Sequence, residues 1–190
     1  MDTTLAALFN HAGLRKLLLV LRVPLFGAFV LALAVYAKPA WFGPAIALSL
    51  CGAAIQLWGF SCLHKHRTLT VNGPYALVRN PIYVGRFFLI LGMILVVGNV
   101  WLLVGFPFLY HFYMINRVRR EEAQLREIFG DAYERYCAAV PRFVPRLTPY
   151  AEGRVAWFER AAFTRNRGAR RVVEAMSFWA LAACFAFWIH

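Results

Sequence analysis

Five stretches of this sequence are apolar over lengths close to the thickness of a bilayer. They cover residues 17–36, 44–63, 82–98, 100–115 and 172–189. Because about 20 apolar residues span a hydrocarbon core and about 17 is near the lower limit, we expect the first two and the last to cross a membrane. The middle two are separated only by the turn dipeptide Gly98-Asn99, which predicts an antiparallel helical hairpin. The sequence therefore predicts an all-α polytopic membrane protein with about five transmembrane helices.

The basic residues predict an orientation for these helices. Lys and Arg beside membrane spans are retained on the cytoplasmic side. With the N-terminus inside, Lys38 is the only Lys or Arg in a segment expected outside. A basic cytoplasmic surface beside anionic lipid headgroups explains the net charge of +12, so no nucleic-acid partner is predicted. We expect a multi-pass integral membrane protein, and its oligomeric state stays open.

Cysteine and histidine usage predicts neither disulfides nor a metal site. Cys51, Cys62, Cys137 and Cys184 show no CxxC spacing, and three of them lie in or beside apolar stretches. We expect free, buried thiols. The histidines of the segment HKH, residues 64–66, lie in a basic loop without a third ligand, which favours solvated side chains over a metal centre.

Three parts are expected along the chain. Residues 1–63 form transmembrane scaffold helices, residues 64–146 form a core with the hairpin, and residues 147–190 add an amphipathic segment and a last membrane helix. In the core, Asn80 is predicted to be the N-cap of a helix that begins at Pro81, and Gly130 to end the helix after the hairpin. Residues 150–171 are predicted to form one interfacial amphipathic helix.

Polar residues concentrate in two segments that flank the hairpin: GPYALVRNPIYVGR at residues 73–86 and RVRREEAQLREIFGDAYERY at residues 117–136. Because the hairpin is antiparallel, both segments lie at the same membrane surface. This places Arg79, Arg86, Arg117, Glu121 and Glu122 near one another. Charges at membrane depth are costly, so their clustering indicates a pocket for a polar or zwitterionic ligand. Ordinary charges that face lipid headgroups are the alternative.

These two segments resemble a known family. GPYALVRNPIYVG resembles the GPYxxxRHPxYxG signature of the isoprenylcysteine carboxyl methyltransferases, and EEAQLREIFGDAYERYCAAVPRFVP resembles their second signature. The resemblance covers residues 66–145. It implies S-adenosyl-L-methionine as cofactor, and no glycine-rich phosphate loop is present to suggest another nucleotide. The chain departs from the family signature at Asn80, where the signature has His. It also departs after residue 145, where this chain adds an amphipathic segment and a last membrane helix.

The resemblance also implies roles for individual residues. Arg117 would hold the methyl acceptor, and Glu121 would contact the cofactor and act with Arg117 in catalysis. The other implied cofactor-binding residues are Arg67, Thr68, Leu69, Thr70, Tyr75, Arg79, Asn80, Pro81, Ile82, Tyr83 and Glu122.

The chemistry leaves several functions open. A carboxylate acceptor is ionised at neutral pH and needs a cation to hold it, which Arg117 supplies. A phospholipid amine would need a base, for which Glu121 or Glu122 is available. The leading hypothesis is thus methyl transfer to a lipidic or hydrophobic acceptor at a carboxylate, with phospholipid N-methylation, a sterol-type reductase dependent on nicotinamide and a non-catalytic scaffold as alternatives. An i, i+4 surface ion pair is the plainer interpretation of Arg117 and Glu121.

Overall fold

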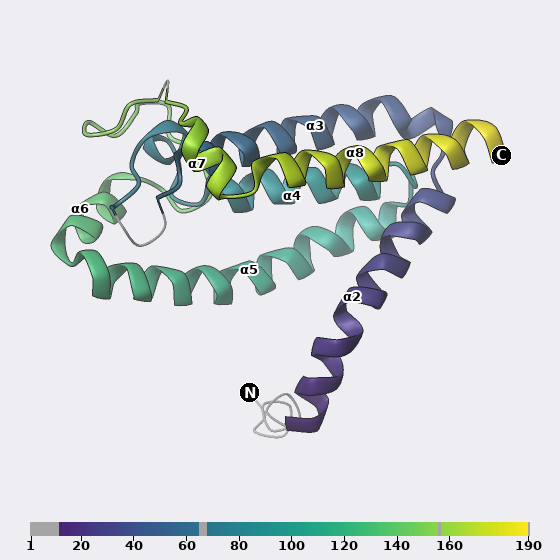
Figure 1. The fold of residues 1–190 in the computed structure, drawn as a ribbon, viewed down its shortest axis with the longest axis horizontal. Coiled ribbons are helices and arrows are strands. Elements are labelled where there is room, and N and C mark those ends of the chain that lie inside the picture. The colour runs from purple at the N-terminus through teal and green to yellow at the C-terminus, as the bar shows by residue number, and fades with distance from the viewer. Residues whose placement is uncertain (1–11, 65–67, 156, 190) are drawn as a thin grey trace.

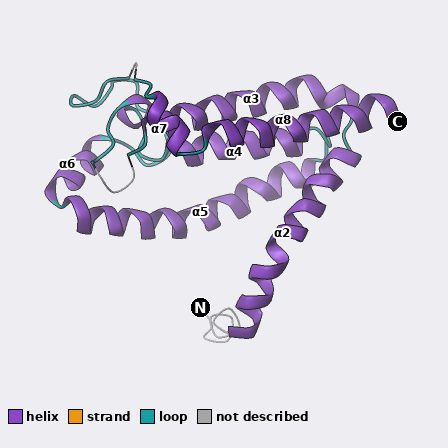
Figure 2. Cartoon of the chain, in the orientation of Figure 1, coloured by secondary structure: helices purple, strands orange, loops and turns teal. Residues whose placement is uncertain are grey.

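Figure 1 shows the computed structural model, which describes residues 12–64, 68–155 and 157–189. Seven α-helices occur along these residues: α2 (Ala12–Val35), α3 (Pro39–Cys62), α4 (Pro81–Leu95), α5 (Val100–Phe129), α6 (Asp131–Ala139), α7 (Arg160–Arg165) and α8 (Gly168–Cys184). A 3-10 helix, η1 (Gly73–Ala76), precedes α4, and a π-helix, η2 (Phe185–Ile189), follows α8. Within the described residues there is no strand (Figure 2), so the all-α prediction is confirmed for them.

Helices α3 and α4 form the most extensive helix pair, and small residues make their close approach possible. A Cβ atom added to Gly85 of α4 would lie 2.6 Å from the carbonyl oxygen of Gly52 on α3. One added to Gly92 would lie 2.6 Å from the carbonyl oxygen of Ala45. Small residues let the backbones of membrane helices pack closely. Helix α8 runs along this pair, and α2 leaves it at an angle (Figure 1).

The predicted hairpin is confirmed by α4 and α5. The side chain of Asn99 caps α5 by accepting hydrogen bonds from the backbone N–H groups of Trp101 and Leu102, at 2.9 and 3.3 Å. Pro81 is the first residue of α4, as predicted, but the side chain of Asn80 makes no capping hydrogen bond. Asn80 occupies the N-cap position, as predicted, and its side-chain NH2 group donates to the carbonyl oxygen of Arg142 at 3.3 Å.

Helix α5 continues well past the apolar part of the hairpin and ends at Gly130, as predicted. Gly130 has a φ of 52°, a conformation that favours glycine, and its N–H donates to the carbonyl oxygen of Arg126. The chain then turns directly into α6. This turn brings the second polar segment back over the start of α4, at the end of the bundle that we call the site end.

Two described helices are long and apolar enough to cross a membrane: residues Pro39–Cys62 and Gly168–Trp188. Residues Pro81–Leu95 form a shorter apolar helix. The expectation of five spans therefore stays a prediction, as does the orientation. All four cysteines are free, as expected, but only Cys62 is buried, whereas Cys51 and Cys184 are exposed on α3 and α8.

The prediction of one amphipathic helix over residues 150–171 was wrong. Only α7 and the first residues of α8 are helical there, and Arg167, with a φ of 57°, separates them. The preceding residues pair their backbone with other parts of the chain. Gly73 donates to the carbonyl oxygen of Arg154 at 2.7 Å, and Glu159 donates to that of Ser61 at 3.1 Å. Backbone groups used in these contacts are not available for a helix.

Candidate functional site

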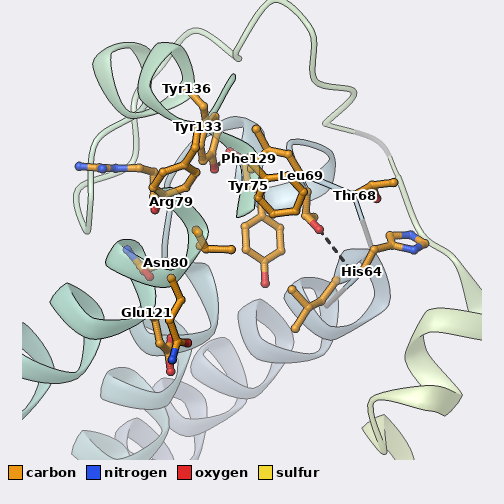
Figure 3. Close-up of a pocket in the computed structure, with 14 residues that line it drawn as sticks. His64, Thr68, Leu69, Tyr75, Arg79, Asn80, Glu121, Phe129, Tyr133 and Tyr136 are labelled. Atoms are coloured by element: carbon orange, nitrogen blue, oxygen red, sulfur yellow. Dashed lines mark hydrogen bonds between the residues drawn. The ribbon is translucent and has the colours of Figure 1, made fainter. Parts of the chain in front are cut away.

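The two polar segments meet at the site end and enclose a cavity of about 340 Å³. This volume lies within the range of roughly 300–1,000 Å³ common for small-molecule sites. The side chains that line it come from the loop after α3, from η1 and the start of α4, and from α5 and α6: Leu63, His64, Thr68, Leu69, Thr70, Tyr75, Arg79, Asn80, Glu121, Gln124, Leu125, Phe129, Tyr133 and Tyr136. In Figure 3, Asn80 and Glu121 lie on one side of Tyr75, and Thr68 and His64 on the other.

The turn GPYA, which forms η1, is anchored from both sides. Gly73 has a φ of 64°, and a Cβ atom there would collide with the Cys62 sulfur, so the position requires glycine. The Tyr136 hydroxyl donates to the carbonyl oxygen of Tyr75 at 2.8 Å. The backbone N–H of Arg79 donates to the carbonyl oxygen of Pro141 at 2.9 Å. The first motif is therefore held in place by the end of the second.

A three-residue cluster joins the hairpin helices just beside the cavity. The Tyr83 hydroxyl donates to Oε1 of Glu121 at 2.6 Å and accepts from Nε of Arg117 at 2.8 Å. Arg117 Nη2 lies 3.2 Å from the same Glu121 oxygen. Both charged side chains are more than two-fifths exposed. Glu121 also lines the cavity, so the cluster connects the cavity to the outer side of the hairpin.

A second charged cluster is buried, with Glu122 at its centre and 1% exposed. Arg142 holds both carboxylate oxygens of Glu122, with its Nε at 3.0 Å and its Nη2 at 2.5 Å. Arg79 Nη1 lies 3.4 Å from Oε1 and also donates to the Cys137 sulfur at 2.7 Å. A bidentate arginine and a second cation offset much of the cost of burying the carboxylate. The predicted single group of charges is thus two separate clusters.

Three buried tyrosines form the aromatic part of the cavity wall. Loss of solvent raises the pKa of Tyr75, Tyr133 and Tyr136 well above the ordinary value of tyrosine. Nearby phenol and thiol groups add to this rise in pKa, because each would repel a phenolate. These side chains are therefore neutral at physiological pH and supply hydroxyl groups and ring faces, not a base.

The structure places the predicted cofactor residues in three groups. Those that line the cavity are Thr68, Leu69, Thr70, Tyr75, Arg79, Asn80 and Glu121. Those that do not line it are Pro81, Ile82, Tyr83 and Glu122, which support its wall or belong to the two clusters. Arg67 lies outside the described residues.

Several residues of the site were not predicted from the sequence to line it, and for Tyr133 and Tyr136 only a packing role was expected. Phe129, Tyr133 and Tyr136 belong to the second signature, and their aromatic character near the motif was a usable signal. Arg142 had no such signal, because it lies in a proline-rich connector 20 residues after its partner Glu122. His64, expected to be solvated, pairs with Glu159 at 2.8 Å. No group of three metal-ligating side chains occurs among the described residues.

The side chains that line the cavity fit a ligand that combines an aromatic ring, hydroxyl groups and a positive charge. Tyr75, Phe129 and Tyr133 offer ring faces, and Thr68 and Asn80 offer hydrogen-bonding groups. Glu121 supplies a carboxylate. Arg79 Nε is buried without a hydrogen-bond partner among the described residues, and a buried unpaired donor is costly. S-adenosylmethionine has the groups that this set would bind.

A family model described as phospholipid methyltransferase matches residues 30–132 of the chain. Over 84 residues the chain is 38% identical to a protein-S-isoprenylcysteine O-methyltransferase of Schizosaccharomyces pombe, which covers 44% of this chain and 36% of that protein. A delta(14)-sterol reductase of Mus musculus is 34% identical over 88 residues, 44% of this chain and 20% of that protein.

A longer alignment joins the chain to the cobalt-zinc-cadmium resistance protein CzcN of Cupriavidus metallidurans, 27% identical over 150 residues, 73% of this chain and 68% of that protein. By contrast, the match to the isoprenylcysteine methyltransferase covers only about a third of the length of that protein. No solved structure matches the chain. The resemblance seen in the two motifs is confirmed at the level of the family.

Proposed function

The chain belongs to the phospholipid methyltransferase family, and we propose that it is a membrane-embedded methyltransferase that esterifies the carboxylate of a lipidic acceptor, as in isoprenylcysteine carboxyl methylation. One observation carries this proposal. The two motifs, separated in sequence by the hairpin, line a single cavity whose edge is the cluster of Tyr83, Arg117 and Glu121. S-adenosylmethionine, when bound, would supply an electrophilic methyl group on a sulfonium.

The cavity residues would hold the cofactor in two ways. Tyr75 and Phe129 present aromatic surface for an adenine ring, and Glu121 places negative charge near a cationic centre. Asn80 supplies a donor and an acceptor without titrating. Because burial raises the pKa of Tyr75 and Tyr136, these hydroxyls keep their protons and add no charge to the wall, to which Glu121 contributes a carboxylate and Arg79 a guanidinium.

Arg117 would hold the acceptor. A guanidinium stays charged in a low-dielectric site and can hold both oxygens of a carboxylate. Its Nε and Nη2 contact Tyr83 and Glu121. Both hydrogens of Nη1 and the second hydrogen of Nη2 are then left to hold the two oxygens of the acceptor. The two contacts fix the plane of the guanidinium, and correct placement of reacting groups contributes several kcal/mol to catalysis.

Calorimetric binding of S-adenosylhomocysteine to the detergent-purified chain tests the cofactor site. Micromolar binding is expected for the wild type, with loss in Glu121→Ala. Glu127→Ala, an exposed carboxylate two turns further along α5, is the matched control and should bind like the wild type. If the folded wild type does not bind this ligand, the methyltransferase proposal fails.

Transfer of labelled methyl groups tests the acceptor. A prenylated cysteine with a free carboxylate should become labelled, and Arg117→Ala should abolish this while it keeps S-adenosylhomocysteine binding. Arg119→Ala, which changes an exposed arginine two residues away, should be active. Labelling of phosphatidylethanolamine instead would favour the N-methyltransferase alternative.

A nicotinamide-dependent reductase is the second candidate, and the match to a sterol reductase favours it. That match covers a fifth of the reductase and is about as long as the match to the isoprenylcysteine methyltransferase, at 88 and 84 residues. NADPH binding by the purified chain, in the absence of S-adenosylhomocysteine binding, would support this candidate.

A further inference from the structure

A second cavity lies deeper in the bundle, away from the candidate site, and it has one polar end and one apolar end. Its volume is about 500 Å³, and it lies between α2, α3, α4 and α8. Arg86, Arg171 and Gln56 form the polar part of its wall together with Glu174. Phe29, Val30, Leu33, Ile90, Met93 and Phe178 form most of the remainder.

The polar residues lie at similar depth below the site end of the bundle. Gln56 is six residues before the end of α3, Arg86 five residues after the start of α4, and Arg171 three residues after the start of α8. At 1.5 Å per residue, these positions are about 9, 8 and 5 Å from their helix ends. With these helix ends at the membrane surface, the polar residues would lie near the boundary between lipid head groups and acyl chains, about 5–10 Å deep.

Gln56 is the most informative of these residues. Gln56 is 8% exposed. The buried side-chain nitrogen and oxygen atoms without a partner in the described part of the chain are Arg79 Nε and Trp179 Nε1, so the Gln56 amide is not sealed off from the cavity that it lines. It lines this cavity and also a neighbouring one of about 450 Å³ on the other side of α8. An amide that lines a cavity in an otherwise apolar bundle offers one donor group and one acceptor to a polar group of a ligand.

The charges of the cavity select an anionic partner. Glu174 is held by Arg170 and Arg171, at 2.8 and 3.1 Å. Arg86 pairs with no carboxylate among the described residues and lies 5.4 Å from the centre of the Tyr83 ring. An unpaired cation inside an apolar bundle is expected to have an anionic partner.

We propose that this cavity binds an anionic phospholipid, with its phosphate beside Arg86, Gln56 and Arg171 and one acyl chain along α2 and α4. The lipid would be a bound ligand and not the methyl acceptor. Its site uses α8, which lies outside the part of the chain that matches the family model. The added C-terminal helix would therefore complete a lipid site in addition to anchoring the chain.

Native mass spectrometry of the full chain tests this proposal. Delipidated protein is mixed with phosphatidylglycerol or phosphatidylcholine of identical acyl chains at equal concentration. We expect one retained phosphatidylglycerol and little phosphatidylcholine. Arg86→Gln and Gln56→Leu should each reduce retention about tenfold, because each removes one strong hydrogen bond to the phosphate. Arg160→Gln is the control, since Arg160 is exposed, does not line the cavity and, among the described residues, is in no ion pair with a residue that does.

Several outcomes would overturn the proposal. Equal retention of the two lipids would mean that the head group is not recognised. Equal loss in Arg160→Gln would mean that surface charge alone is responsible. Displacement of the lipid by inorganic phosphate at the same concentration would mean that the apolar end plays no part. Thermal unfolding of each variant identifies misfolding, and Arg171→Gln then replaces any variant that fails to fold.

Discussion

Replacement of Glu122 by alanine should destabilise the fold more than most single changes on the surface of α5. Glu122 is 1% exposed and is held by Arg142 through two hydrogen bonds and by Arg79 through an ion pair. The alanine variant leaves two arginines without their anion. Removal of one partner of a buried ion pair costs about 3–5 kcal/mol.

The structure places the expected cost near the lower end of that range. The Arg142 side chain is 35% exposed and can be rehydrated, whereas that of Arg79 is 12% exposed and cannot. We therefore expect a loss of about 3 kcal/mol. For a chain of 190 residues, about 2–4 °C of Tm per kcal/mol gives a decrease of roughly 6–12 °C.

Tryptophan fluorescence during heating in detergent measures this decrease. Glu127→Ala, exposed on the same helix, is the control and should melt within about 2 °C of the wild type. A double variant with Arg142→Ala should lose less than the sum of the two single variants, because the two residues interact directly. A Tm for Glu122→Ala within about 2 °C of the wild type would refute this account of the buried cluster.

Three further predictions follow from other contacts. Gly85→Ala should separate α3 from α4 and lower the Tm in the same assay, since its Cβ atom meets the backbone of Gly52 and Gln56, whereas Gly105→Ala, with nothing within 4 Å, should be neutral or stabilising. Incorporation of labelled methyl groups should fall roughly tenfold to a hundredfold in Tyr83→Phe, with unchanged affinity for S-adenosylhomocysteine, because this change removes only the hydroxyl that joins Arg117 to Glu121. Tyr113→Phe is the control and should leave incorporation unchanged. Stability measured by denaturant should fall as the pH rises above about 10. The folded state raises the pKa of Tyr75, Tyr133 and Tyr136, so the unfolded chain loses these protons first, and a flat profile above pH of about 10 would contradict this.

The apolar runs and the turn signals were sufficient to predict most helices. The hairpin, the start of α4 at Pro81 and the end of α5 at Gly130 depend on local chemistry that the sequence carries. The helix predicted over residues 150–171 failed for a non-local reason. Its backbone groups pair with Ser61 and Gly73, which are about 80 to 100 residues earlier, and no periodicity within the segment reports such pairing.

In the candidate site, too, local sequence signals predicted some features, and contacts between distant residues determined the others. Motif position predicted that Tyr75, Asn80 and Glu121 lie together, and they line one cavity. It did not predict that the neighbours Glu121 and Glu122 belong to different clusters. Residues one apart on a helix point in directions about 100° apart, so Glu121 faces Tyr83 and Glu122 faces Arg142. Arg142 lies in a connector without regular structure, and only the fold brings it to Glu122.

Asn80 bears on the choice between a carboxylate and an amine acceptor. The family signature has His at this position, and Asn can neither take up nor release a proton in the physiological range. Here Asn80 lines the cavity and donates to the carbonyl oxygen of Arg142, the residue that holds Glu122. Its contacts therefore position the connector against the first motif. An amine acceptor must lose a proton before it reacts, whereas a carboxylate is already ionised. Asn80 supplies no base for an amine, and the carboxylate acceptor that we propose needs none.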